Sequence, residues 1–142
     1  MNTLNPSHRP PSENWADIGK LRVRYLDWGS HGDPVILLHG LASSAHWYDL
    51  VAPHLRNRYR LIAPDQRGHG QTTQADNGYD WETLTKDILG LIDQLDLRQV
   101  AVFGHSWGAS VALKLAARFP GRIHALGLID GGTSRGDGPV EN

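Results

Sequence analysis

The first structured part of the chain alternates apolar and polar positions. From Leu21 to Tyr25 every second residue is apolar, and an arginine stands at each position between. A period of two is typical of strands. The segment 15–29 therefore predicts two short strands, joined by a turn at Gly19-Lys20.

Four further apolar runs are short enough to be strands. The run from Val35 to Leu38 has no polar residue, which is typical of a strand covered on both faces. The other three runs are also short and are bounded by loop-forming residues. These four predicted strands are Val35–Leu38, Tyr59–Ala63, Gln99–Gly104 and Ala125–Asp130.

Helical spacing of apolar residues occurs in the segments that separate these runs. It extends over residues 47–55, where Pro53 is expected to interrupt it, over 81–95 and over 109–119. Asp80 precedes the second segment and is a good N-cap. Strands and helices therefore alternate, which predicts an α/β fold whose mostly parallel sheet carries helices on both faces.

The length of 142 residues fits one domain. We expect the core to occupy residues 15–130. The polar, proline-bearing segment 1–14 and the glycine-rich segment 131–142 are expected to be flexible tails.

Composition excludes several function classes. Fourteen basic and fifteen acidic residues give a net charge of -1, so we expect no nucleic-acid or membrane partner. The chain has no cysteine, and its histidines and carboxylates lack metal-ligand spacing, so neither a metal nor another cofactor is predicted. No apolar stretch resembles a signal peptide or membrane helix, which favours a soluble, cytoplasmic protein.

The stretch Gly104-His105-Ser106-Trp107-Gly108 carries the clearest candidate chemistry. It matches G-x-S-x-G, in which a serine nucleophile occupies a strained turn between a strand and a helix. Here the required strand precedes the serine and the required helix follows it. The alternative is that Ser106 merely caps the helix that begins at Trp107.

Three motifs, in order and at suitable spacing, carry a family resemblance. They are "LLHGLASS" at 37–44, "DQRGHGQT" at 65–72 and "GHSWGAS" at 104–110. With them the chain resembles the α/β-hydrolase superfamily over residues 15–130. The resemblance implies that Ser106 is the nucleophile and that the backbone N–H groups of Leu41 and Trp107 form the oxyanion hole.

The other residues to be considered for the site are one aspartate and three histidines. The resemblance makes Asp130 a candidate acid, because some family members place the acid after this strand, whereas more place it one strand later, which this chain lacks. Its alternative role is that of a polar residue ending a strand. We expect His69 to tie its own loop to neighbouring loops, and strand alternation to direct His105 away from the serine hydroxyl. His39 is expected to belong to the loop that turns toward the site.

A catalytic histidine is missing from the expected place. The resemblance implies the order serine, acid, histidine, but only His124 follows Ser106. His124 opens a strand whose other end carries the site, and six residues of strand span roughly 20 Å. We therefore expect an N-terminal half of the fold, truncated after the strand that ends near Asp130. A missing C-terminal half or a second chain would complete the sheet, cover its bare apolar edge and supply the histidine.

These observations predict a serine hydrolase that cleaves a carboxylic ester or similar acyl substrate through a Ser106 acyl-enzyme. A serine nucleophile argues against the halide- and epoxide-cleaving members, which the resemblance associates with aspartate. Esterase, lactonase, amidase and carbon–carbon bond hydrolase remain open. We expect the 142 residues alone to be inactive. The alternatives are a non-catalytic ligand-binding or interaction protein on the same scaffold, and a fragment with no function of its own.

Overall fold

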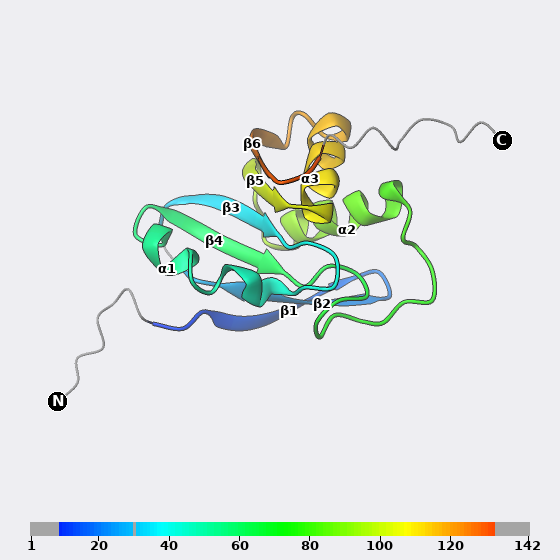
Figure 1. Cartoon of the computed structure of the whole chain (residues 1–142), viewed down its shortest axis with the longest axis horizontal. Coiled ribbons are helices and arrows are strands. Elements are labelled where there is room, and N and C mark those ends of the chain that lie inside the picture. Colours follow the sequence, from blue (N-terminus) through cyan, green and yellow to red (C-terminus); the bar gives the residue numbers. More distant parts are fainter. Residues whose placement is uncertain (1–8, 30, 133–142) are drawn as a thin grey trace.

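A six-stranded sheet forms the centre of the protein (Figure 1). The computed structural model describes residues 9–29 and 31–132 of the chain. The strands lie in the order β1-β2-β4-β3-β5-β6. Their bounds are β1 Ser12–Ile18, β2 Leu21–Asp27, β3 Asp33–Leu38, β4 Tyr59–Pro64, β5 Val100–His105 and β6 Ile123–Ile129.

Strand direction divides the sheet into two parts. β1 and β2 form an antiparallel hairpin, and β2 also pairs antiparallel with β4. The strands β4, β3, β5 and β6 are parallel to one another. β3 lies between β4 and β5. After β3 the chain forms β4 on one side of it, and later forms β5 on the other side. Such a switch point opens a crevice at the carboxyl ends of the parallel strands.

Helices cover both faces, as the sequence predicts. On one face, α2 (Trp81–Gln94) and α3 (Trp107–Arg118) pack against alternate strand residues such as Ile36 and Val102. On the other, the 3-10 helix η2 (Ala45–Tyr48) and the short helix α1 (Ala52–Leu55) cover residues such as Leu37 and Leu61. The sheet core is therefore built from both faces of β3 and β4.

Helix α2 begins where the sequence predicts. The carboxylate of Asp80 accepts a hydrogen bond from the backbone N–H of Thr83 at 2.9 Å, which satisfies one of the free donors of the first turn. The helix has 14 residues. In the two described ranges of the chain, no helix is long and apolar enough to cross a membrane.

Most boundaries differ from the expected ones by a few residues, and two of the differences change an assignment. β1 begins at Ser12, so the last three residues of the expected tail 1–14 belong to the sheet. They pair with β2, and the Ser12 hydroxyl donates to the carbonyl oxygen of Asp27 at 3.2 Å. The expected helix over 47–55 is two short elements, η2 and α1, with Pro53 in the first turn of α1. Residues 1–8 and 133–142 of the expected tails lie outside the described residues.

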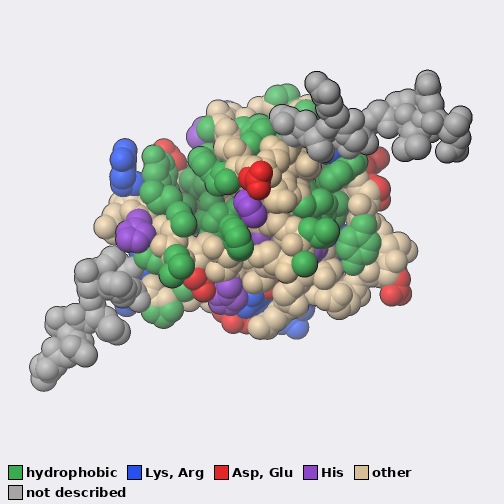
Figure 2. Space-filling view, viewed as in Figure 1, with side chains coloured by type: hydrophobic (Ala, Val, Ile, Leu, Met, Phe, Trp, Pro, Cys, Tyr) green, Lys and Arg blue, Asp and Glu red, His purple; other side chains and the backbone are tan. Residues whose placement is uncertain are grey.

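The β6 side of the sheet is apolar and exposed. Leu126, Leu128 and Ile129 of β6 and Phe103 of β5 each keep more than a third of their surface exposed. Hydrophobic side chains are also exposed in several places on the face shown in Figure 2. Among the residues that the structure describes, no strand pairs with the outer edge of β6, which agrees with the predicted truncated sheet.

Candidate active site

Ser106 stands at the junction of β5 and α3 in a strained conformation. Its backbone angles, a φ of 53° and a ψ of -118°, lie outside the regions that residues other than glycine prefer. Its N–H donates to the carbonyl oxygen of Ile129 at 2.9 Å, and its own carbonyl accepts from Ala109 at 2.9 Å. The side chain makes no capping hydrogen bond to α3. Ser106 therefore occupies the N-cap position of α3, but its side chain does not cap the helix.

The two glycines of the motif permit close packing at this turn. A Cβ on Gly104 would lie 2.2 Å from the carbonyl oxygen of Gly108. A Cβ on Gly108 would lie 2.4 Å from the carbonyl oxygens of Leu38 and His39. Real Cβ atoms do not approach backbone oxygens so closely, so α3 can begin this near β3 and β5 only with glycine at both positions.

The loop after β3 passes directly beside Ser106. A Cβ on Gly40 would lie 3.3 Å from the Cβ of Ser106. Leu41 follows, and neither its N–H nor that of Trp107 donates to an acceptor within the described part of the chain. Ala42, next in the loop, has a φ of 58°. Leu41 and Trp107 thus carry two backbone donors with no acceptor among the described residues, one in the loop after β3 and one at the start of α3.

His39 and His69 are both fixed by backbone hydrogen bonds. Nδ1 of His39 donates to the carbonyl oxygen of Gly40 at 2.8 Å, and its Nε2 accepts from the N–H of Gln66 at 3.0 Å. Nδ1 of His69 donates to the carbonyl oxygen of Arg67 at 2.9 Å, and its Nε2 accepts from the N–H of Ala42 at 3.3 Å. In each ring Nδ1 thereby acts as the donor and Nε2 as the acceptor. His69 ties its loop to the loop after β3, as the sequence predicts.

Burial controls the charge of His39. Its side chain has no exposed surface, and this burial lowers its pKa from 6.5 to about 4. The hydrogen bond to Gly40 acts in the opposite direction, and the neighbouring His69 lowers the pKa further. His39 is therefore neutral at physiological pH.

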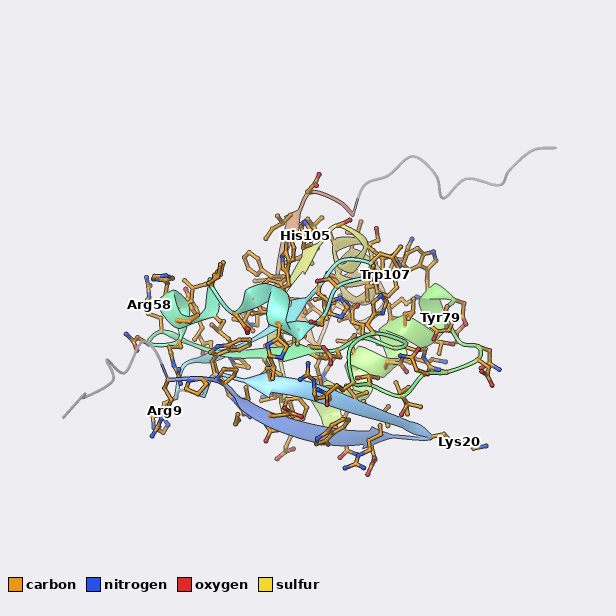
Figure 3. All side chains as sticks on the ribbon, turned by 60° about the horizontal axis from the view of Figure 1, so that its bottom comes forward. Arg9, Lys20, Arg58, Tyr79, His105 and Trp107 are labelled. Atoms are coloured by element: carbon orange, nitrogen blue, oxygen red, sulfur yellow. The ribbon has the colours of Figure 1, made fainter. Side chains whose placement is uncertain are left out.

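His105 and Trp107 extend from the turn at Ser106, the elbow between β5 and α3, toward different neighbours (Figure 3). The His105 ring stacks on that of Trp47, with centroids 4.6 Å apart and planes 13° apart. The Trp107 ring stacks on that of His69, with centroids 5.3 Å apart. Nδ1 of His105 is buried and has no hydrogen-bond partner in the described structure. The two residues beside Ser106 thus hold the surrounding loops.

A buried ion pair that the sequence analysis missed supports the loop 65–72. Strand alternation predicts a polar, exposed position for Arg24, but this residue is 2% exposed and its Nε donates to Asp65 at 2.7 Å. The Asp65 carboxylate also accepts from the N–H groups of Ala45 and Gln71. Burial alone would raise the pKa of Asp65, but these hydrogen bonds and the Arg24 charge outweigh it and lower the pKa.

Asp130 and His124 lie at opposite ends of β6. Asp130 is exposed and has a φ of 50°, and it directly follows Ile129, whose carbonyl binds the Ser106 N–H. A Cβ on the next residue, Gly131, would lie 2.4 Å from the Ser106 carbonyl oxygen. His124 is exposed near the start of the strand, where Ile123 pairs with Val100. The structure therefore brings Asp130, but not His124, close to the serine.

Non-glycine residues with positive φ gather around this turn. In the described ranges there are four, and the three at Ala42, Ser106 and Asp130 all adjoin the elbow. Such strain persists where surrounding contacts enforce it, and it clusters at functional sites. No group of three histidine, aspartate or glutamate side chains in these ranges could hold a metal ion.

Residues 33–140 match the family model of the alpha/beta hydrolase fold. The chain belongs to this family. A haloalkane dehalogenase from Mesorhizobium japonicum is 31% identical over 129 residues, which are 91% of this chain and 42% of that protein. A non-heme chloroperoxidase from Streptomyces lividans is 40% identical over 110 residues, covering 75% of this chain and 40% of that protein.

A solved structure shows the same arrangement. The crystal structure of wild-type Cfl2 from Burkholderia cenocepacia is similar with a TM-score of 0.86 and 26% identity. The similarity covers 96% of this chain and 48% of that chain. The chain thus spans less than half the length of these hydrolase-fold proteins.

Proposed function

We propose that the chain carries the nucleophile of a serine hydrolase that cleaves a carboxylic ester or a similar acyl substrate. The strained conformation of Ser106, at a φ of 53° and a ψ of -118°, is the observation that supports this role. A serine that only capped the helix would use its hydroxyl oxygen to accept a hydrogen bond from a backbone N–H of the first turn. Here the hydroxyl makes no capping bond, and Ser106 directly follows the carboxyl end of β5.

The proposed chemistry is acyl transfer in two steps. Ser106 Oγ attacks the carbonyl carbon, its proton passes to a general base, and the carbonyl π electrons move onto the oxygen. The N–H groups of Leu41 and Trp107 stabilise this oxyanion; one such donor is worth about 10²–10³ in rate. The oxyanion then collapses, the protonated alcohol leaves, and water releases the acid from the acyl-enzyme.

The general base is assigned to a histidine outside the described residues, either on a continuation of the chain or on a second chain. His39 and His69 use both ring nitrogens in hydrogen bonds, and His124 lies at the far end of β6. Asp130 is the candidate acid that would orient this histidine, because it lies beside the serine backbone. In this proposal the 142 residues alone turn over little substrate.

The proposal is tested by labelling the chain with a fluorophosphonate probe and measuring its intact mass. Ser106 Oγ would displace fluoride from phosphorus and lose its proton to a base. Imidazole added to the buffer can take the place of the missing histidine side chain. We expect slow labelling without imidazole, clearly faster labelling with it, and no labelling of Ser106→Ala under either condition.

Ser110→Ala is the matched control, because Ser110 lies one helical turn further along α3. It should be labelled at the rate of the unmodified chain. If a folded chain reacts no faster than its Ser106→Ala variant with or without imidazole, the proposed nucleophile is wrong. That result would favour the non-catalytic binding protein.

A further inference from the structure

His69 contacts both sides of the proposed oxyanion hole. Its Nε2 accepts a hydrogen bond from the N–H of Ala42, the residue after Leu41, at 3.3 Å. Its ring stacks on the ring of Trp107, with planes 30° apart. One imidazole therefore touches the neighbour of one oxyanion donor and the side chain of the other.

The two donors have no common element to hold them in place. Leu41 lies in the loop after β3, outside any helix or strand, whereas Trp107 is the first residue of α3. The positive φ of Ala42 strains the loop beside Leu41. The separation of the two donors therefore depends on contacts that join the loop to the helix.

His69 itself stands on a rigid support. Its Nδ1 donates to the carbonyl oxygen of Arg67, which leaves the Nε2 lone pair directed at Ala42. Its own N–H donates to the carbonyl oxygen of Gln66 at 2.9 Å. The next residue, Gly70, packs so closely on Asp65 that a Cβ there would lie 2.1 Å from the carboxylate. The buried carboxylate thus fixes the turn that presents the imidazole.

We propose that His69 is a positioning residue, which sets the separation of the Leu41 and Trp107 N–H groups by joining the loop after β3 to the start of α3. This role rests on the proposed function, because it assumes that these two groups bind the oxyanion. His69 does not contact the reacting atoms. Displacing a catalytic donor by about 1 Å can lower a rate by about 10²-fold, so the loss of this link has a measurable effect.

Two variants separate the two contacts of the imidazole. His69→Phe keeps an aromatic face for Trp107 but removes the acceptor for Ala42. His69→Gln removes the ring but offers an amide oxygen near the place of Nε2. His54→Phe, at an exposed histidine of α1, is the matched control.

The first measurement is fluorophosphonate labelling of Ser106 in imidazole over a range of probe concentrations. For His69→Phe we expect the maximal rate to fall by about 10- to 100-fold, while the half-saturating probe concentration stays within about twofold. His69→Gln should recover most of the rate, and His54→Phe should match the unmodified chain. A His69→Phe chain with an unchanged maximal rate overturns the proposal. An equal loss in both His69 variants, together with a lower unfolding midpoint, shows only a structural role and also overturns it.

The second measurement does not depend on reactivity. In amide NMR spectra, the signals of Leu41 and Ala42 should broaden or shift in His69→Phe and remain near their positions in His69→Gln. If the unmodified chain shows no Ser106-dependent labelling, the proposed function fails, but these spectra still test the positioning. Unchanged Leu41 and Ala42 signals in His69→Phe would show that His69 does not hold the loop.

Discussion

The carbonyl oxygen of Ile129 accepts a hydrogen bond from the backbone N–H of Ser106 at 2.9 Å. Ile129 is the last residue of β6, and Ser106 follows the last residue of β5. The ladder between these two parallel strands thus extends one residue into the elbow. This bond and the hydrogen bond from the Ala109 N–H to the Ser106 carbonyl oxygen hold Ser106 in a backbone conformation that few residues other than glycine adopt.

Replacing the serine by glycine should therefore stabilise the fold. A residue held in a sparsely populated region costs about 1–3 kcal/mol, and glycine adopts positive φ freely. Glycine also makes the unfolded chain more flexible, which opposes the gain by about 0.4–1 kcal/mol. We expect Ser106→Gly to raise the free energy of unfolding by about 1 kcal/mol, as measured by urea denaturation.

The control for this prediction is Ser110→Gly within α3. There the backbone is helical, so glycine should lower the free energy of unfolding by about 0.5 kcal/mol. If Ser106→Gly destabilises the chain as much as Ser110→Gly does, the backbone of Ser106 is not strained.

Close packing at Gly108 should make this position intolerant of alanine. The added Cβ would meet the carbonyl oxygens of Leu38 and His39 at 2.4 Å, and backbone cannot move aside as a flexible side chain can. Overpacking of this kind costs about 1–3 kcal/mol or more. We expect Gly108→Ala to lower the free energy of unfolding by at least about 2 kcal/mol, measured by urea denaturation.

Gly121→Ala provides the comparison, because a Cβ at Gly121 meets no atom within 4 Å. That variant should unfold within about 0.5 kcal/mol of the unmodified chain. Equal stabilities of the Gly108 and Gly121 variants would contradict the steric explanation of the motif.

His39 should make the fold less stable in mild acid. Its pKa is lowered from 6.5 to about 4, chiefly by burial, so the unfolded chain binds a proton at a pH where the folded chain does not. The stability linked to this group is complete above pH 6.5 and is lost as the pH falls toward 4. At 1.36 kcal/mol per pKa unit the loss is about 3 kcal/mol. Urea denaturation followed by tryptophan fluorescence between pH 7 and 4 measures it.

His39→Asn tests this assignment. Asparagine keeps a donor for the carbonyl oxygen of Gly40 but cannot take up a proton in this range. The lowered pKa of Asp65 affects stability only near or below the ordinary aspartate value of 3.8, outside the main part of this window. A pH dependence between 6.5 and 4 that is as steep in His39→Asn as in the unmodified chain would rule out His39 as its source.

Local patterns in the sequence determined the elements and their order. Strand alternation predicted the hairpin of β1 and β2, and helical spacing with the capping residue Asp80 predicted the start of α2 at Trp81. The motif around Ser106 marked a turn between a strand and a helix. Each of these features depends on residues within about four positions of one another, so the sequence alone predicts them.

Only the tertiary structure decided which distant residues meet. Arg24 and Asp65 are 41 positions apart, and His69 and Ala42 are 27 apart. The alternation of apolar and polar residues assigns Arg24 to one face of β2. It does not predict that Asp65, from a loop far along the chain, pairs with Arg24 and that Arg24 is buried. The placement of β3 between β4 and β5 brings the loops 39–44 and 65–72 to the elbow. Strand order is set by the burial of whole faces of the sheet, and no short stretch of sequence contains that information.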